Sequence, residues 1–191
     1  MKPFALLILA GGRAERMGGI VKGHLRRPDG RTILGALLED LGPLAREQAL
    51  VATAARHAEL ELPAAVRRIV DLGQGPAAAL IGAASQLEQP WVLAVGADQA
   101  RASPASVAWL RAEVQDADPA LVAAVDGGRQ PLLALYARSA LAAVGPGFEG
   151  RSLMALLDRL GARSLRPPAE LEADFSSINT WEDAGALDRS S

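Results

Sequence analysis

The sequence predicts an α/β protein built as a single-domain, three-layer sandwich, in which helices cover both faces of a mostly parallel sheet. Short apolar runs alternate with stretches typical of helices, and that alternation indicates parallel strands joined through helices. Residues 4–10 and 91–95 are continuous apolar runs, as expected of strands buried on both faces. The length of 191 residues and the hydrophobic content of 50% suit one domain with a substantial core, over residues 1–191.

The predicted strands are short runs of apolar and branched residues. They fall at residues 4–10, 50–53, 66–70, 91–95, 120–125 and 131–136. The predicted helices lie at residues 33–41, 76–87, 104–114, 139–144, 153–160 and 181–187. Ser103 before Pro104 and Asn179 before Thr180 suit helix starts, and Gly161 suits a helix end. Ligands of such sheets bind where the strands end, so the strand ends are the expected place for a binding site.

The first predicted strand runs directly into a loop that combines glycines with basic side chains. Gly11 and Gly12 let the backbone approach a ligand closely and leave N–H groups to face phosphates. Arg13, Arg16 and Lys22 add positive charge in the same loop. Glycine-rich turns after strands are common and most bind nothing, but repeated glycines with basic residues favour a nucleoside triphosphate. The loop has neither the P-loop pattern nor the Gly-x-Gly-x-x-Gly of dinucleotide folds.

Two aspartates stand at the ends of later predicted strands. Asp71 follows the strand at residues 66–70 and precedes Gly75-Pro76, which suits a helix start facing a ligand, although a plain loop-to-helix transition is the simpler reading of that pair alone. Asp98 follows the strand at residues 91–95, where a carboxylate suits either Mg²⁺ binding or capping of the next turn. Opposite a triphosphate loop, the magnesium role is favoured.

Composition narrows the class of partner. The formal net charge of -2 gives no electrostatic support for binding nucleic acid or an anionic membrane surface. The basic loop is therefore a local feature, which indicates a small anionic ligand. The absence of cysteine excludes disulfides and thiolate metal sites. No signal peptide or spanning segment is evident, so we expect a cytoplasmic protein.

The chain resembles the molybdenum cofactor guanylyltransferase family of nucleotidyltransferases. The opening loop matches the family's signature as Leu-Ala-Gly-Gly at residues 9–12, Arg-Met-Gly-Gly at residues 16–19 and Lys22. Asp71, Gly75-Pro76 and Asp98 match later motifs in the same order. The segments at residues 130–136, 151–153 and 175–180 match its remaining patterns. Order and spacing agree throughout, which makes the resemblance more specific than any single motif.

This resemblance implies a Rossmann-like nucleotidyltransferase fold and a nucleotidyl transfer that uses Mg²⁺. GMP would pass from GTP to the phosphate of molybdenum-bound molybdopterin, and pyrophosphate would leave. The implied catalytic residues are Arg16, Lys22 and Asp98, with Asp98 as the metal ligand. The implied nucleotide-binding residues are Leu9, Ala10, Gly11, Gly12, Lys22, Thr53, Asp71, Gly75 and Asp98. GTP and molybdenum-molybdopterin are the expected partners, with no nucleic acid or membrane, and the chain is expected to be a monomer or weak homo-oligomer.

Several positions depart from the family pattern and keep alternatives open. Val21 replaces an aspartate, Ala79 a glycine and Ala100 a proline, and Thr53 stands where the family has an asparagine that contacts the nucleotide. One alternative is a cytidylyltransferase or a sugar-nucleotidyltransferase-like enzyme with another acceptor. The other is a nucleotide-binding paralogue with impaired catalysis, against which the retention of Lys22 and Asp98 argues.

The remaining candidates are of lower interest. His24 and His57 are expected on the surface, and the three tryptophans are expected to pack rather than to stack on a ligand. For Arg151, two interpretations are equally supported: a surface charge, and a cation that binds the acceptor.

Overall fold

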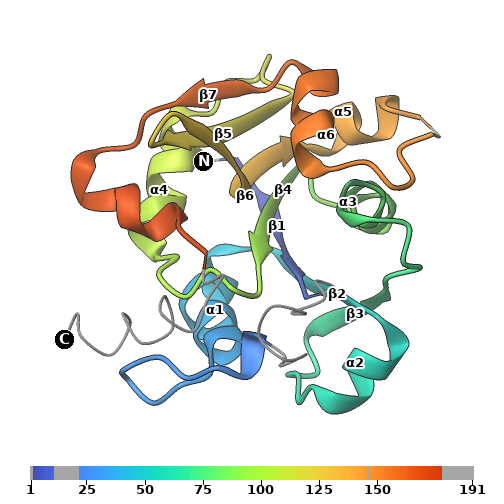
Figure 1. Cartoon of the computed structure of the whole chain (residues 1–191), viewed down its shortest axis with the longest axis vertical. Coiled ribbons are helices and arrows are strands. Elements are labelled where there is room, and N and C mark those ends of the chain that lie inside the picture. The colour runs from blue at the N-terminus through green and yellow to red at the C-terminus, as the bar shows by residue number, and fades with distance from the viewer. Residues whose placement is uncertain (1, 11–21, 146, 178–191) are drawn as a thin grey trace.

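The computed structural model describes residues 2–10, 22–145 and 147–177, and within them seven strands form one sheet in the order β3-β2-β1-β4-β6-β5-β7 (Figure 1). The strands are β1 (Phe4–Leu9), β2 (Glu47–Ala52), β3 (Val66–Val70), β4 (Trp91–Gly96), β5 (Ala120–Val125), β6 (Gly128–Ala137) and β7 (Arg163–Leu165). The helices are α1 (Ile33–Leu41), α2 (Ala54–Glu59), α3 (Pro76–Ala84), α4 (Pro104–Glu113), α5 (Arg138–Ala143) and α6 (Leu153–Leu160). Three 3₁₀ helices are also described, η2 (Lys22–His24), η3 (Gly42–Leu44) and η4 (Ala169–Phe175).

The sheet is mostly parallel, with one reversed strand. β1 pairs in parallel with β2 and β4, β2 with β3, and β5 with β7, whereas β6 runs antiparallel to both β4 and β5. The carboxyl ends of β1, β2, β3 and β4 therefore lie along one edge of the sheet. The same edge carries the turn between β5 and β6, because β5 runs in the direction of β4.

Two apolar layers cover the sheet, and β1 feeds both because alternate side chains point to opposite faces. Phe4, Leu6 and Ile8 belong to the core beneath α1, α4 and η4. Ala5 and Leu7 belong to the core beneath α3, α5 and α6. Figure 1 shows these two groups of helices on opposite sides of the sheet, which confirms the predicted three-layer α/β sandwich. Among the helices of the described residues, none is both long and apolar enough to cross a membrane.

Several predicted elements agree with the structure. The helices at residues 33–41 and 153–160 and the strands at residues 66–70 and 120–125 have the predicted bounds. Ser103 caps α4 with a hydroxyl that accepts from the Ser106 N–H, and Gly161 ends α6 in the left-handed conformation at φ 65°. The predicted helix at residues 181–187 and the start at Asn179 lie outside the described residues.

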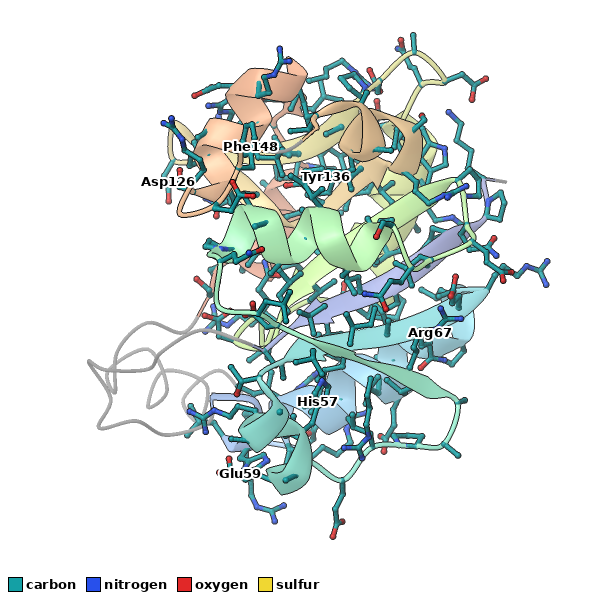
Figure 2. All side chains as sticks on the ribbon, turned by 90° about the vertical axis from the view of Figure 1, so that its right-hand side faces the viewer. His57, Glu59, Arg67, Asp126, Tyr136 and Phe148 are labelled. Carbon is teal, nitrogen blue, oxygen red and sulfur yellow. The ribbon has the colours of Figure 1, made fainter. Side chains whose placement is uncertain are left out.

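The sequence analysis missed α2, β7 and η4 and misplaced one histidine. His57 was expected on the surface, but it is only 8% exposed. Its Nε2 lies 2.8 Å from the Ile69 carbonyl oxygen, so the ring ties α2 to β3 (Figure 2). His57 was expected at a helix start with its side chain on the surface, and the expectation was wrong because the ring turns inward and bonds to the β3 backbone. His24 is exposed, and Trp109 packs edge-on against Phe175 with ring centroids 5.7 Å apart, as expected.

Candidate active site

Four parallel strand ends bring the predicted site residues to one edge of the sheet. Hydrogen bonds continue past the strands there, from the Ala10 N–H to Val51 O at 2.8 Å and from the Asp71 N–H to Ala52 O at 2.8 Å. The Ala97 N–H likewise donates to Leu9 O at 3.0 Å. The first residues beyond β1, β3 and β4 are therefore held in register along this edge, with β2 between β3 and β1.

The opening loop is described at its two ends. Leu9 and Ala10 stand at the end of β1, whereas Gly11, Gly12 and Arg16 lie outside the described residues. Lys22 begins η2, and the next residue, Gly23, returns the chain to the end of β4. A Cβ atom built on Gly23 would lie 3.4 Å from Leu34 Cβ and 3.7 Å from Ala97 Cβ. The backbone at Lys22 is thus close to the residue that precedes Asp98.

Asp98 is half-buried in a tight turn after β4. The buried Gln99 side chain fixes this turn, because its Oε1 accepts from the Gly96 N–H at 2.9 Å. The Gln99 N–H in turn donates to Gly96 O at 3.1 Å. A Cβ atom built on Gly96 would lie only 2.6 Å from Asp98 Oδ1, so the carboxylate lies directly over the Gly96 α-carbon. The glycine leaves the space that the carboxylate occupies.

Asp98 suits a magnesium site that relies on one protein carboxylate. No group of three or more histidine, cysteine, aspartate or glutamate side chains that could hold a metal ion occurs in residues 2–10, 22–145 and 147–177. Magnesium in nucleotide enzymes is typically held by one or two carboxylates together with substrate phosphates and water. A single half-buried carboxylate at the end of β4 is compatible with that donor set.

Asp71 stabilises its own turn. Its Oδ1 accepts from the Gly73 N–H at 2.8 Å, which is the local aspartate turn that commonly follows a strand. Gly73 and Gly75 both have positive φ, at 74° and 93°, where other residues are strained. These two glycines direct the chain from β3 into α3.

A second loop packs on this turn and brings Arg151 to the site. The Gly150 N–H donates to Gln74 O at 2.7 Å. A Cβ atom built on Gly75 would lie 3.3 Å from Gly150 Cα and 3.6 Å from Arg151 O, so this close contact also needs a glycine at position 75. Motif spacing left Arg151 undecided, whereas the contact with Gly75 sets its backbone beside the predicted nucleotide site.

Thr53 has a structural role that the sequence analysis did not anticipate. It is the N-cap of α2, and its hydroxyl oxygen accepts from the Arg56 N–H at 3.3 Å. The residue stands at the end of β2, as expected of a nucleotide contact. Its hydroxyl oxygen, however, already satisfies a free N–H group of the helix.

A hollow of about 100 Å³ lies beside Asp71, between β3 and α3. Its lining includes Val70, Leu72 and Ala79, of which Val70 and Leu72 are 53% and 78% exposed. Ligand pockets typically measure roughly 300–1,000 Å³, so this hollow is too small to hold a nucleotide by itself. The methyl group at Ala79 stands in this hollow rather than at the ends of β1 and β4.

Comparison with known proteins then decides the family. Residues 6–165 match the family described as a MobA-like NTP transferase domain. The chain belongs to this family. The chain is therefore a nucleotidyltransferase, and the recognised resemblance to molybdenum cofactor guanylyltransferases is confirmed.

The relatives agree over almost the whole chain. It is 33% identical over 197 aligned residues to the molybdenum cofactor guanylyltransferase of Burkholderia cenocepacia, covering 96% of this chain and 94% of that protein. The molybdenum cofactor guanylyltransferase of Burkholderia lata is 32% identical, again over 96% of this chain and 94% of that protein.

Solved structures show the same fold at lower identity. The molybdopterin-guanine dinucleotide biosynthesis protein A of Archaeoglobus fulgidus superposes with a TM-score of 0.73 at 23% identity, over 97% of each chain. The 4-diphosphocytidyl-2C-methyl-D-erythritol synthase of Anaerococcus prevotii superposes with a TM-score of 0.72 at 13% identity, over 98% of this chain and 95% of that chain.

Proposed function

We propose that this protein transfers GMP from GTP to the terminal phosphate of molybdenum-bound molybdopterin and releases pyrophosphate. The near-complete match to relatives named molybdenum cofactor guanylyltransferase supports this choice of substrates. The observation that supports the chemistry is that Asp71 and Asp98 follow strands whose ends lie on the same edge of the sheet as the end of β1, with Asp98 next to the residue that Gly23 contacts.

The reaction needs positioning and charge neutralisation more than covalent help from the protein. An acceptor phosphate oxygen attacks the α-phosphorus of GTP, the bond from that phosphorus to the bridging oxygen breaks, and pyrophosphate leaves. The attacking phosphate is already ionised near neutral pH, so no general base is required. Neither histidine is placed to act as one, since His24 is exposed and His57 is bound to β3.

The residues at the strand ends divide this work in our proposal. Backbone N–H groups of Gly11 and Gly12, with the side chains of Arg16 and Lys22, neutralise the triphosphate. The β1 end at residues 9–10, Thr53, Asp71 and Gly75 contact the rest of the nucleotide. Arg151 is assigned to the acceptor phosphate, because its loop packs on Gly75.

Asp98 is the proposed Mg²⁺ ligand. When bound, the ion supplies positive charge against the phosphate oxygens as negative charge shifts toward the leaving group. The protein's part is to hold the Asp98 carboxylate in one orientation, which the Gly96–Gln99 turn does. Asp98→Asn should abolish turnover and remove the magnesium-dependent part of nucleotide binding, while nucleotide alone still binds. Full turnover by this variant would contradict the metal assignment.

The cap at Thr53 bears on a second candidate, transfer of CMP from CTP, because this residue is expected to contact the nucleotide. The Thr53 hydroxyl oxygen serves as the α2 cap, so it is a weaker base-recognition group than the asparagine that the family has at this position. The base preference therefore has to be measured.

The test compares GTP, CTP, UTP, ATP and TTP, each with and without Mg²⁺, by their effect on the melting temperature. A ligand present at 100 times its Kd adds about 2.7 kcal/mol to the free energy of unfolding, which corresponds to a shift of about 5–10 °C for a chain of this size. We expect this shift for GTP with Mg²⁺, followed by transfer of the α-phosphate label of GTP to molybdopterin. A shift with CTP alone would support the second candidate. No shift with any nucleotide would contradict both, whereas a shift without transfer of the label would favour the impaired paralogue.

A further inference from the structure

β6, which pairs with β4, contains a β-bulge close to Asp98. In the β5–β6 pair, Leu121 faces Leu135 and Ala123 faces Gln130. These two pairs are two residues apart along β5 and five residues apart along β6. β6 therefore has a bulge of three extra residues. On its other side, β6 pairs with β4 only from Trp91↔Ala137 to Ala94↔Ala134. Bulges of this kind redirect side chains and are frequent next to active sites.

The bulge contains a strained residue. Leu133 is fully buried and has φ 54°, in the left-handed region that leucine rarely adopts. Residues held in this region by their surroundings cluster at functional sites. The surroundings must therefore impose this conformation on Leu133.

Tyr136 provides one of the constraints. Its hydroxyl donates to the Pro131 carbonyl oxygen at 2.6 Å, so it closes the bulge from the far end. Tyr136 is fully buried on the sheet face covered by α3, α5 and α6, where Figure 2 labels it. Burial raises the pKa of the Tyr136 hydroxyl, which therefore keeps its proton and remains a donor.

Leu132 lies next to the Asp98 turn, on the same sheet face as Ala134 and Tyr136. A Cβ atom built on Gly96 would lie 3.0 Å from Leu132 Cδ1 and 2.6 Å from Asp98 Oδ1. The leucine methyl group and the carboxylate oxygen therefore converge on the same point above Gly96. Leu132 is half-buried and comes from β6, whereas Asp98 comes from the turn after β4.

We propose that Leu132 and Tyr136 are positioning residues for Asp98: the Tyr136 hydroxyl holds the backbone at Pro131, next to Leu132, and the Leu132 methyl group limits the carboxylate to the orientation that binds Mg²⁺. This inference rests on the proposed nucleotidyl transfer, and it adds residues that touch neither nucleotide nor metal. Groups around a metal ligand commonly change metal affinity or activity by 10-fold or more.

The test measures Mn²⁺ binding by electron paramagnetic resonance, in the presence of a GTP analogue with a methylene group between the α- and β-phosphates. Leu132→Ala and Tyr136→Phe should each raise the Kd for Mn²⁺ by about tenfold. In turnover assays, both variants should lower kcat with little change in KM for GTP, as expected when the loss falls on the transition state. Leu132→Met keeps the side-chain volume and should retain affinity close to that of the wild type.

Leu165→Ala is the matched control, because Leu165 is a half-buried leucine on β7, far from Asp98 in the sheet. It should lose stability without losing Mn²⁺ affinity. Unchanged Mn²⁺ binding in both Leu132→Ala and Tyr136→Phe would overturn the positioning role and leave the proposed function intact. A wild-type protein that binds neither the analogue nor Mn²⁺ would overturn both. Equal loss in Leu165→Ala would show a general effect of stability and also overturn the positioning role.

Discussion

Gly96 leaves room for two side chains that a methyl group would displace. Its built Cβ atom falls 2.6 Å from Asp98 Oδ1 and 3.0 Å from Leu132 Cδ1. The Gly96 N–H also holds the turn through Gln99. The absence of a side chain at Gly96 therefore leaves the space in which the Asp98 carboxylate lies.

Gly96→Ala should reduce turnover by about 10- to 100-fold and weaken the magnesium-dependent rise in melting temperature, because the methyl group pushes the Asp98 carboxylate aside. The protein should still fold, since Gly96 has no positive φ. Kinetic assays and melting curves with and without Mg²⁺–GTP check both statements.

Gly82→Ala is the control for that prediction. Gly82 lies inside α3 with no atom within 4 Å of its built Cβ. Alanine should stabilise this helix by about 0.5–1 kcal/mol and leave turnover unchanged. An equal loss of activity in the two variants would contradict the argument from Gly96.

At the scale of the elements, an ion pair adds to the backbone pairing that holds β7 against β5. Arg163 donates from Nε to Asp118 Oδ1 at 2.9 Å and from Nη2 to Asp118 Oδ2 at 2.8 Å. Asp118 Oδ2 also accepts from the Gln115 N–H at 2.8 Å, and the residue is buried. The Arg163 guanidinium therefore holds the pKa of the Asp118 carboxyl below its ordinary value of 3.8.

Asp118→Asn should lower the free energy of unfolding by about 2 kcal/mol at pH 7, because hydrogen bonds to charged groups are among the stronger ones. A carboxyl whose pKa is depressed by folding stabilises the protein above the ordinary value near 3.8, and this contribution disappears as the pH falls through the lower, folded-state pKa. The difference between wild type and variant should therefore be present at pH 7 and shrink as the pH falls below 3.8. Urea unfolding across this range measures it, and a difference independent of pH would contradict the role of the charge.

The elements also show how far sequence reasoning reaches. α1 and α6 were predicted with their bounds because their apolar residues recur at helical spacing and end at recognisable caps. β7, α2 and η4 are three, six and seven residues long, and none of them was predicted, although the six-residue α5 was. Contacts that are distant in sequence decide them, such as Asp118 with Arg163 and His57 with Ile69.

The site follows the same division. Asp71 and Asp98 were predictable as polar residues that end apolar strands. The approach of Arg151 was not, because it depends on Gly150 packing against Gly75 from a distant part of the chain. The three-residue bulge in β6 was not predicted, although a proline inside a strand, here Pro131, is typical of bulges and edges. The positive φ of Leu133 could not be predicted, because leucine itself does not favour it.

At the scale of the whole molecule, the two edges of the sheet differ. We call the edge that carries the carboxyl ends of β1, β2, β3 and β4 the reactive edge, because the proposed reaction takes place there. Gly73 and Gly96 lie at the reactive edge, and each N–H donates to an oxygen of a side chain. Gln115 makes the same kind of bond at the opposite edge, before β5 begins. Binding of a ligand at the strand ends should therefore change these amides differently.

Hydrogen exchange should show Mg²⁺–GTP slowing the amides of Gly73 and Gly96, because the nucleotide orders both turns, while Gln115 changes little. All three amides donate to side-chain oxygens, so a difference in their protection reports their place in the sheet and not the type of hydrogen bond. Uniform protection of all three would indicate a general rise in stability instead of binding at this edge.

Because β6 runs antiparallel to its neighbours, the edge with the strand ends also carries the hairpin that joins β5 to β6. β1, β2 and β3 contribute rigid strand ends to one half of the reactive edge. β5 and β6 contribute a hairpin whose tip, at Asp126 and Gly127, has φ of 50° and 75°. A hairpin tip can be lengthened or replaced with little effect on the strands behind it. Grafted tips offer a route to new acceptors in an enzyme that keeps its nucleotide, since the phosphate-binding framework would remain untouched.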